Sequence, residues 1–195
     1  PSYIQGVSGE TLLWTSIASA FALSVTAILH SAFSKGAVAR RWAFFAAVTG
    51  PVMIGYIEAL WAPGSGIGLN MWSGVILSFA AMATFCAERA AHHDKDNHLR
   101  VSLAALVAMS MIALSATVVL SNAALSVALA VLVLGAVALD DRFKLRALML
   151  FAQAGAAILV YRALVDPGIF WVGENAALWE VALGYGVPGL LLGAS

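Results

Sequence analysis

Charged residues are scarce in this sequence. Only 10% of the residues are Asp, Glu, Lys or Arg, whereas soluble domains carry about 25%. Basic and acidic residues both number 10, so the formal net charge is zero and the basic surplus that favours nucleic-acid binding is missing. The scarcity of charge argues against a water-soluble fold, and we expect no nucleic-acid partner.

Cysteine is nearly absent as well. Because Cys86 is the single cysteine, this chain alone builds neither an intramolecular disulfide nor a cysteine-cluster metal site. The first residues, Pro1 to Glu10, lack the basic segment that precedes the apolar run of a signal peptide. We therefore expect no signal peptide, and the missing initiator Met suggests a processed chain or a fragment of something longer.

Long apolar runs are what the sequence has in abundance, with 62% hydrophobic residues. The runs reach the roughly 20 residues that cross a bilayer core of about 30 Å, and they do not alternate as membrane β-strands do. In hydrocarbon the backbone N–H and C=O groups must form hydrogen bonds within their own segment, so helices are the remaining structure that can span the membrane. The sequence predicts an all-α, polytopic transmembrane bundle over residues 1–195, with about seven helices at 10–33, 39–61, 69–91, 99–120, 123–139, 145–165 and 177–193.

Turn-forming residues separate these runs. The stretch from Ala62 to Gly68 holds Pro63 and three glycines, and Asp166-Pro167-Gly168 ends the sixth run. The fourth and fifth runs are interrupted only by Ser121 and Asn122. A single helix over 99–139 would measure about 60 Å, twice the bilayer core, so we expect a turn there.

The distribution of charge predicts the topology. Alternating the helices places loops near 34–38, 88–98 and 140–144 on one side of the membrane, and Arg162 is the only basic residue on the other side. By the positive-inside rule the basic loops are cytoplasmic, and the N-terminus is not. The nine basic residues of the cytoplasmic side are Lys35, Arg40, Arg41, Arg89, Lys95, Arg100, Arg142, Lys144 and Arg146.

Tryptophans gather near the predicted helix ends, as in the interfacial belts of membrane proteins. Trp42 lies at a cytoplasmic end. The others lie near non-cytoplasmic ends or in the connecting loop: Trp14, Trp61, Trp72, Trp171 and Trp179. We interpret all six as belt residues.

The last third of the chain carries a more specific pattern. The pattern begins with an apolar helix from Leu125 and continues in this order: the loop Asp140-Asp141-Arg142, the step Asp166-Pro167, the run Leu178-Trp179-Glu180, and finally Gly184-Tyr185-Gly186-Val187-Pro188. This order resembles the carboxy-terminal part of the uncharacterised bacterial multi-pass membrane proteins called domain of unknown function 2339. The resemblance implies a bacterial inner membrane and a segment of a larger helical bundle, and it implies no activity.

Ionisable residues at membrane depth are a functional hypothesis by default. Glu58, Arg162 and Glu180 fall toward the non-cytoplasmic side, and Arg162 could pair with either carboxylate. With Tyr56, Tyr161 and Tyr185 they would form a polar site for a small polar or anionic ligand. The alternative is a structural ion pair, or an arginine that reaches the interface.

Histidines supply the remaining polar candidates. His30 and Gln153 are placed to form hydrogen bonds between helices. His92, His93, Asp94, Asp96 and His98 crowd one loop and form a weak metal candidate, because imidazole and carboxylate bind zinc. They lack an ordered ligand spacing or a second contributing segment, so a solvated loop explains them better.

No motif specifies a reaction, so we expect no catalytic residue and no cofactor. An enzyme using His30 and Glu58 is disfavoured because the two lie toward opposite faces. The favoured function is a non-catalytic membrane module: a segment of a larger membrane protein, or an accessory or structural subunit of a membrane complex, in contact with lipid and other membrane subunits. The alternative is a transporter or channel-like protein with its site near Glu58, Arg162 and Glu180; only Gly50-Pro51 and Gly186-Val187-Pro188 resemble the broken helices of transporters.

Overall fold

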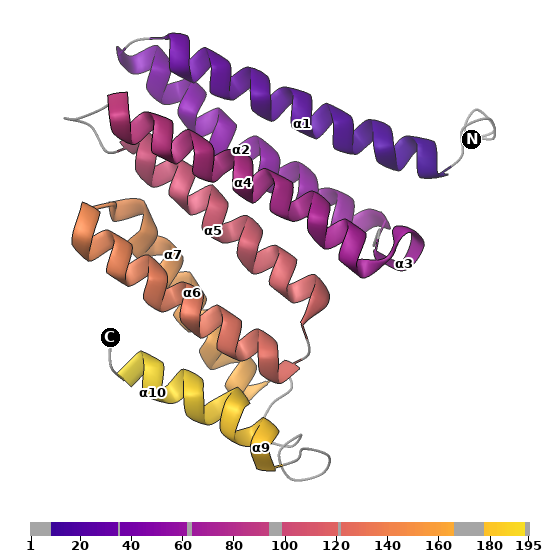
Figure 1. Cartoon of the computed structure of the whole chain (residues 1–195), viewed down its shortest axis with the longest axis vertical. Helices are drawn as coiled ribbons and strands as arrows, with labels where there is room; N and C mark the ends of the chain where they lie inside the picture. Colours follow the sequence, from indigo (N-terminus) through magenta and orange to yellow (C-terminus); the bar gives the residue numbers. More distant parts are fainter. Residues whose placement is uncertain are drawn as a thin grey trace. The chain divides into compact units, whose positions relative to one another are not determined.

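The computed structural model describes residues 9–34, 36–61, 64–93, 99–120, 122–165 and 178–193. Within these ranges every secondary-structure element is a helix (Figure 1). The prediction of an all-α fold is therefore confirmed. Its physical basis is the requirement that backbone groups in hydrocarbon bond within their own segment.

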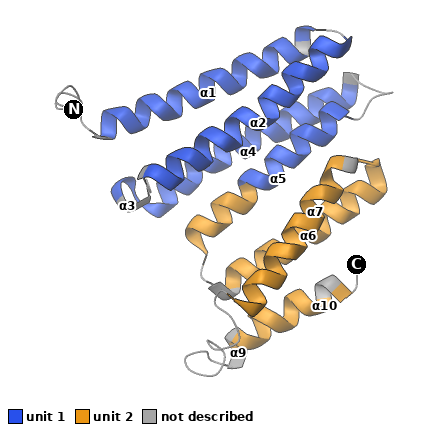
Figure 2. Ribbon diagram, turned by 180° about the vertical axis from the view of Figure 1, so that it is seen from behind, with its two compact units in different colours: residues 1–111 blue, residues 112–195 orange. Residues whose placement is uncertain are grey.

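The chain divides into two compact units, Pro1–Met111 and Ile112–Ser195 (Figure 2). The division falls inside α5, which spans Leu99–Val119. The single bundle over 1–195 stays a prediction.

Unit 1 contains four helices besides the first part of α5: α1 (Gly9–Phe33), α2 (Gly36–Trp61), α3 (Gly64–Ile67) and α4 (Leu69–His93). Helix α1 packs along α2 and also contacts α4. Large side chains fill the interior, including Ile54 and Ile57 of α2 and Trp72, Ile76 and Phe79 of α4. The rings of Phe21 and Phe79 meet edge to face, with centroids 5.5 Å apart, which favours the α1–α4 contact.

A tight turn joins α1 to α2. Gly36 has a φ of +61°, a left-handed conformation that glycine adopts without steric penalty. The N–H of Ser34 donates to the carbonyl of His30 at 3.0 Å, and the hydroxyl of Ser31 donates to the carbonyl of Ala39 across the turn at 3.2 Å. The first bond satisfies a carbonyl in the last turn of α1 that would otherwise lack a partner, and the second ties α1 to α2.

The predicted break after the second helix is present, and it contains a short helix that the sequence analysis does not predict. Helix α3 packs against α4, and Gly68, at a φ of +90°, separates the two. The N–H of Trp72 donates to the carbonyl of Gly68 at 3.1 Å. Gly68 therefore provides the left-handed conformation that separates α3 from α4, whereas Gly64 and Gly66 are helical.

Unit 2 contains α6 (Asn122–Phe143) and α7 (Arg146–Leu164), followed by α9 (Leu178–Val181), η2 (Ala182–Gly186) and α10 (Val187–Gly193). Helix α6 packs against α7, η2 and α10. A β-carbon added to the buried Gly155 of α7 would lie 2.5 Å from Cγ2 of Val133 on α6. Close approach of α6 and α7 therefore depends on the absence of a side chain at Gly155, as in many membrane helix pairs.

Among the described residues, six helices are long and apolar enough to cross a membrane, namely α1, α2, α4, α5, α6 and α7. The chain is thus a multi-pass membrane protein. The seventh predicted helix is also helical, but η2 is a π-helical segment in which the N–H of Val187 donates to the carbonyl of Ala182. The Gly186-Val187-Pro188 step therefore lies where a π-turn passes into α10 within a continuing helix, whereas Pro51 lies within an uninterrupted α2.

The predicted loop boundaries are partly wrong, because three helices extend into the predicted loops, and two of them, α4 and α6, do so with charged residues. Residues 36–38 begin α2, residues 88–93 end α4 and residues 140–143 end α6. Between α6 and α7 only Lys144 and Leu145 are non-helical. Charged side chains at a helix end reach water along their own stems, so an apolar run marks the hydrocarbon span rather than the full helix.

Candidate functional site

Glu58 lies near the end of α2, and its carboxylate accepts a hydrogen bond from Nε1 of Trp72 on α4. Trp72 is completely buried, with 0% of its surface exposed. The interpretation of Trp72 as a belt residue is therefore wrong, because a belt tryptophan faces the membrane interface. The buried indole N–H needs an acceptor, and Glu58 provides it.

The other members of the predicted polar site are divided between the two units. Tyr56 belongs to unit 1 with Glu58, and 59% of its surface is exposed. Arg162 lies in the last turn of α7 in unit 2, where Tyr161 is 56% exposed and Tyr185 lies in η2. Glu180 is in α9, and its side chain is outside the described part of the structure. Pairing of Arg162 with Glu58 or Glu180 stays a prediction.

The two residues predicted to form hydrogen bonds between helices are both exposed. Nδ1 of His30 lies 2.9 Å from the carbonyl of Thr26 in the same helix. Its ring lies against Trp42 of α2, with centroids 4.7 Å apart. His30 thus joins α1 to α2 by a ring contact, and Gln153 points outward from α7.

The histidine and aspartate cluster is only partly described. His92 and His93 belong to the end of α4, not to a loop, and Nδ1 of His92 lies 2.8 Å from the carbonyl of Glu88. The side chain of His93 and all of Asp94, Asp96 and His98 lie outside the described residues. Among the residues that are described, no group of three or more His, Cys, Asp or Glu is placed to hold a metal ion.

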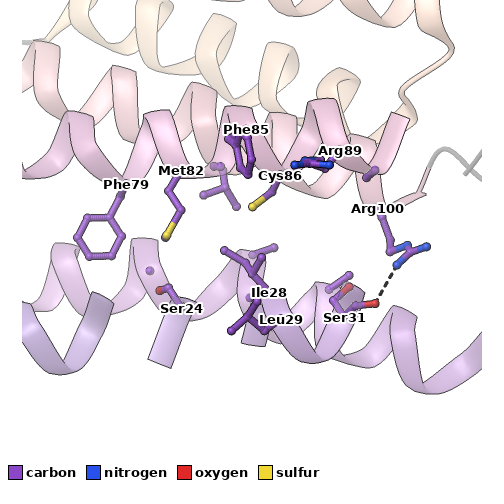
Figure 3. A pocket seen from close by; sticks show the side chains of 18 of the residues that line it. Ser24, Ile28, Leu29, Ser31, Phe79, Met82, Phe85, Cys86, Arg89 and Arg100 are labelled. Atoms are coloured by element: carbon purple, nitrogen blue, oxygen red, sulfur yellow. Dashed lines mark hydrogen bonds between the residues drawn. The ribbon is translucent and has the colours of Figure 1, made fainter. Parts of the chain in front are cut away.

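Unit 1 contains a cavity of about 530 Å³ that the sequence analysis does not predict (Figure 3). Helices α1, α2, α4 and α5 line it. Its volume falls in the range of about 300 to 1,000 Å³ that is usual for small-molecule sites. Four small residues of α2 leave this space: Ala43, Ala46, Ala47 and Gly50. Each of these residues lies three or four positions from two of the others, and they therefore share one face of α2. This spacing was the sequence signal that could have indicated the cavity, although small residues on one face more often indicate close helix packing.

The cavity has one basic end and one apolar end. Arg89 and Arg100 lie at the basic end, whereas Phe79 and Met82 lie toward the other (Figure 3). The guanidinium of Arg89 is 5.4 Å from the centroid of the Phe85 ring. Nη1 of Arg100 donates to the carbonyl of Ser31 at 2.8 Å, which fixes the start of α5 beside the end of α1.

The deep end is apolar except for one hydroxyl. Ser24 is 1% exposed, and within the described part of the chain its Oγ has no hydrogen-bond partner. A β-carbon added to Gly50 would lie 3.3 Å from this oxygen. The side chains of the cavity therefore offer cations at one end and mostly hydrocarbon along the rest.

Comparisons with models of protein families, with curated proteins and with solved structures found no match to this chain. The resemblance to domain of unknown function 2339 accordingly stays a prediction.

Proposed function

We propose that this chain is a non-catalytic multi-pass membrane module that packs against further transmembrane helices. It acts as an accessory subunit of a membrane complex or as a segment of a larger membrane protein. The chemistry of its described polar groups favours this role, because Glu58 and Arg100 are both engaged in hydrogen bonds that hold one helix to another.

The outward face of α1 is the observation that carries the proposal. Thr11, Thr15, Ala18, Ala22 and Thr26 follow one another at intervals of three or four residues, and all five are exposed. The hydroxyl of Thr15 is bonded within α1, to the carbonyls of Thr11 and Leu12 at 2.9 Å, so it adds little polarity to the surface. A smooth face of small residues allows a second backbone to approach closely, which is how transmembrane helices associate.

The extent of outward-facing surface agrees with this role. In each of the six spans only 17% to 33% of the residues in the most apolar window are buried inside the chain. The remaining surface contacts lipid or other helices. We also propose that the basic helix ends face the cytoplasm, on the strength of the charge asymmetry. The further proposal of a bacterial inner membrane is based on the family resemblance.

Native mass spectrometry of protein extracted with its surrounding lipid tests the proposal. We expect wild-type protein to travel in an assembly heavier than the 20.3 kDa chain. Ala18→Leu with Ala22→Leu should release the single chain, because two leucines hold the neighbouring backbone away. Ala81→Leu, at an exposed position on α4, is the matched control and should leave the assembly intact. A wild-type protein that runs as a single chain would contradict the proposal.

A further inference from the structure

We propose that the cavity of unit 1 is a binding site for one anionic phospholipid of the surrounding bilayer, with its phosphate at Arg89 and Arg100 and one acyl chain along the apolar wall. The cavity is lined by none of the residues that form the outward face of α1 described above, so this proposal does not depend on that face. The inference rests on the polarity, the depth and the accessibility of the cavity.

The distribution of polar and apolar side chains in the cavity matches an amphiphilic ligand. Arg89 and Arg100 place two guanidinium groups at one end, and arginine binds phosphate with charge-assisted hydrogen bonds. Each guanidinium carries several N–H donors, so a phosphate at this end can accept hydrogen bonds from these arginines. The adjoining wall is hydrocarbon, and α1 and α4 supply it with Ile28, Leu29, Phe79, Met82 and Phe85 (Figure 3).

The depth of the cavity matches one leaflet. Arg89 and Phe79 lie ten residues apart on α4, and a rise of about 1.5 Å per residue separates them by about 15 Å. Half of a hydrocarbon core of about 30 Å is the same length. An acyl chain whose phosphate lies at the arginines would therefore end near Phe79 and Ser24, which lie toward the other end of the cavity (Figure 3).

Lipid can reach the cavity from the side. Leu29 and Phe85 line the cavity and are 50% and 57% exposed, respectively. The cavity is therefore continuous with the apolar surface of the spans. The arginines lie at the helix ends where basic residues collect, and basic pockets between transmembrane helices at the cytoplasmic side are a recognised way to bind anionic head groups.

Native mass spectrometry of delipidated protein tests this site. Dioleoyl phosphatidylglycerol is titrated against dioleoyl phosphatidylcholine, which has the same chains but no net charge. We expect one molecule of phosphatidylglycerol to be retained in preference, and Arg89→Gln to weaken its binding about fivefold, since each arginine contributes on that order near a membrane surface. Arg41→Gln, an exposed arginine of α2 that does not line the cavity, is the charge control and should bind as wild type does.

A second pair of variants tests the acyl chain. Ala104 lines the cavity from α5, whereas its neighbour Ala105 does not. Ala104→Leu should reduce retention of phosphatidylglycerol, and Ala105→Leu should leave it unchanged. Glycerol phosphate, which has the phosphate without the chains, should not compete. Any of four results would overturn the proposal. These are equal binding of the two lipids, equal effects of the two arginine variants, equal effects of the two leucine variants, and effective competition by glycerol phosphate.

Discussion

The hydrogen bond between Glu58 and Trp72 offers a direct test of whether Glu58 has a structural role. Two substitutions separate the alternatives. Glu58→Leu removes the acceptor and leaves the buried indole N–H without it, whereas Glu58→Gln keeps an oxygen at the same place. If Glu58 has a structural role, the stability of the protein depends on a hydrogen-bond acceptor at this position. If Glu58 has a transport role, the activity depends on its charge.

The magnitude follows from the burial of Trp72, whose side chain is 0% exposed. Leaving a buried donor unsatisfied costs about 1 to 3 kcal/mol in soluble proteins. Hydrogen bonds between membrane helices average about 0.6 kcal/mol and reach about 1.7 kcal/mol. We expect Glu58→Leu to lower the free energy of unfolding by about 1 to 2 kcal/mol, and Glu58→Gln to lower it by less than about 1 kcal/mol.

The assay is equilibrium unfolding by sodium dodecyl sulfate in mixed micelles, followed by far-ultraviolet circular dichroism. Trp72→Phe removes the donor, so a double-mutant cycle with Glu58→Leu isolates the energy of the pair. We expect a coupling energy of about 1 kcal/mol. A coupling energy of zero, with Glu58→Leu as stable as wild type, would refute the structural role of the bond.

Two further predictions concern the packing of unit 2 and the orientation of the chain. Gly155→Ala should destabilise the protein by about 1 to 3 kcal/mol in the same unfolding assay, because Val133 is stiff at χ1 and cannot easily rotate away from the added methyl group. Adding Val133→Ala to the same chain should restore part of the lost stability. A Gly155→Ala variant as stable as wild type would rule out the close contact. In a Cys86→Ser background, Lys144→Cys should not react with a membrane-impermeant maleimide in intact cells, whereas Leu120→Cys should react. In permeabilised cells both variants should be labelled. The reverse pattern would overturn the proposed cytoplasmic placement of the basic ends.

The helices of this protein are readable from the sequence because a single physical requirement determines them. A span must be apolar along its whole length and must pair its own backbone, so the apolar runs between Glu10 and Val165 predict six spans. The helix ends are less predictable. Charged residues such as Arg89 and Arg142 continue the helices beyond the apolar run, since their side chains reach the interface while the backbone stays helical.

The polar contacts are less readable because they depend on which helices are neighbours. A tryptophan at a predicted helix end suits both an interfacial belt and a buried hydrogen bond, and the position of Glu58 decides between them for Trp72. The cavity is harder still, because it arises where side chains of four helices fail to fill the space between them. Small residues at helical spacing are compatible with a tight contact or with a gap, and only the opposing helices distinguish the two.

The π-turn at Ala182–Gly186 fits one more residue into the helix than α-helical spacing provides. Each residue of an α-helix turns the chain by about 100°, so the extra residue rotates all of α10 by roughly that angle about its own axis. Pro188 is buried in the observed arrangement. Deleting one residue of the π-turn would keep the segment helical yet present a different side of α10 to α6. The register of this short segment, rather than its composition alone, thus selects which side chains meet α6.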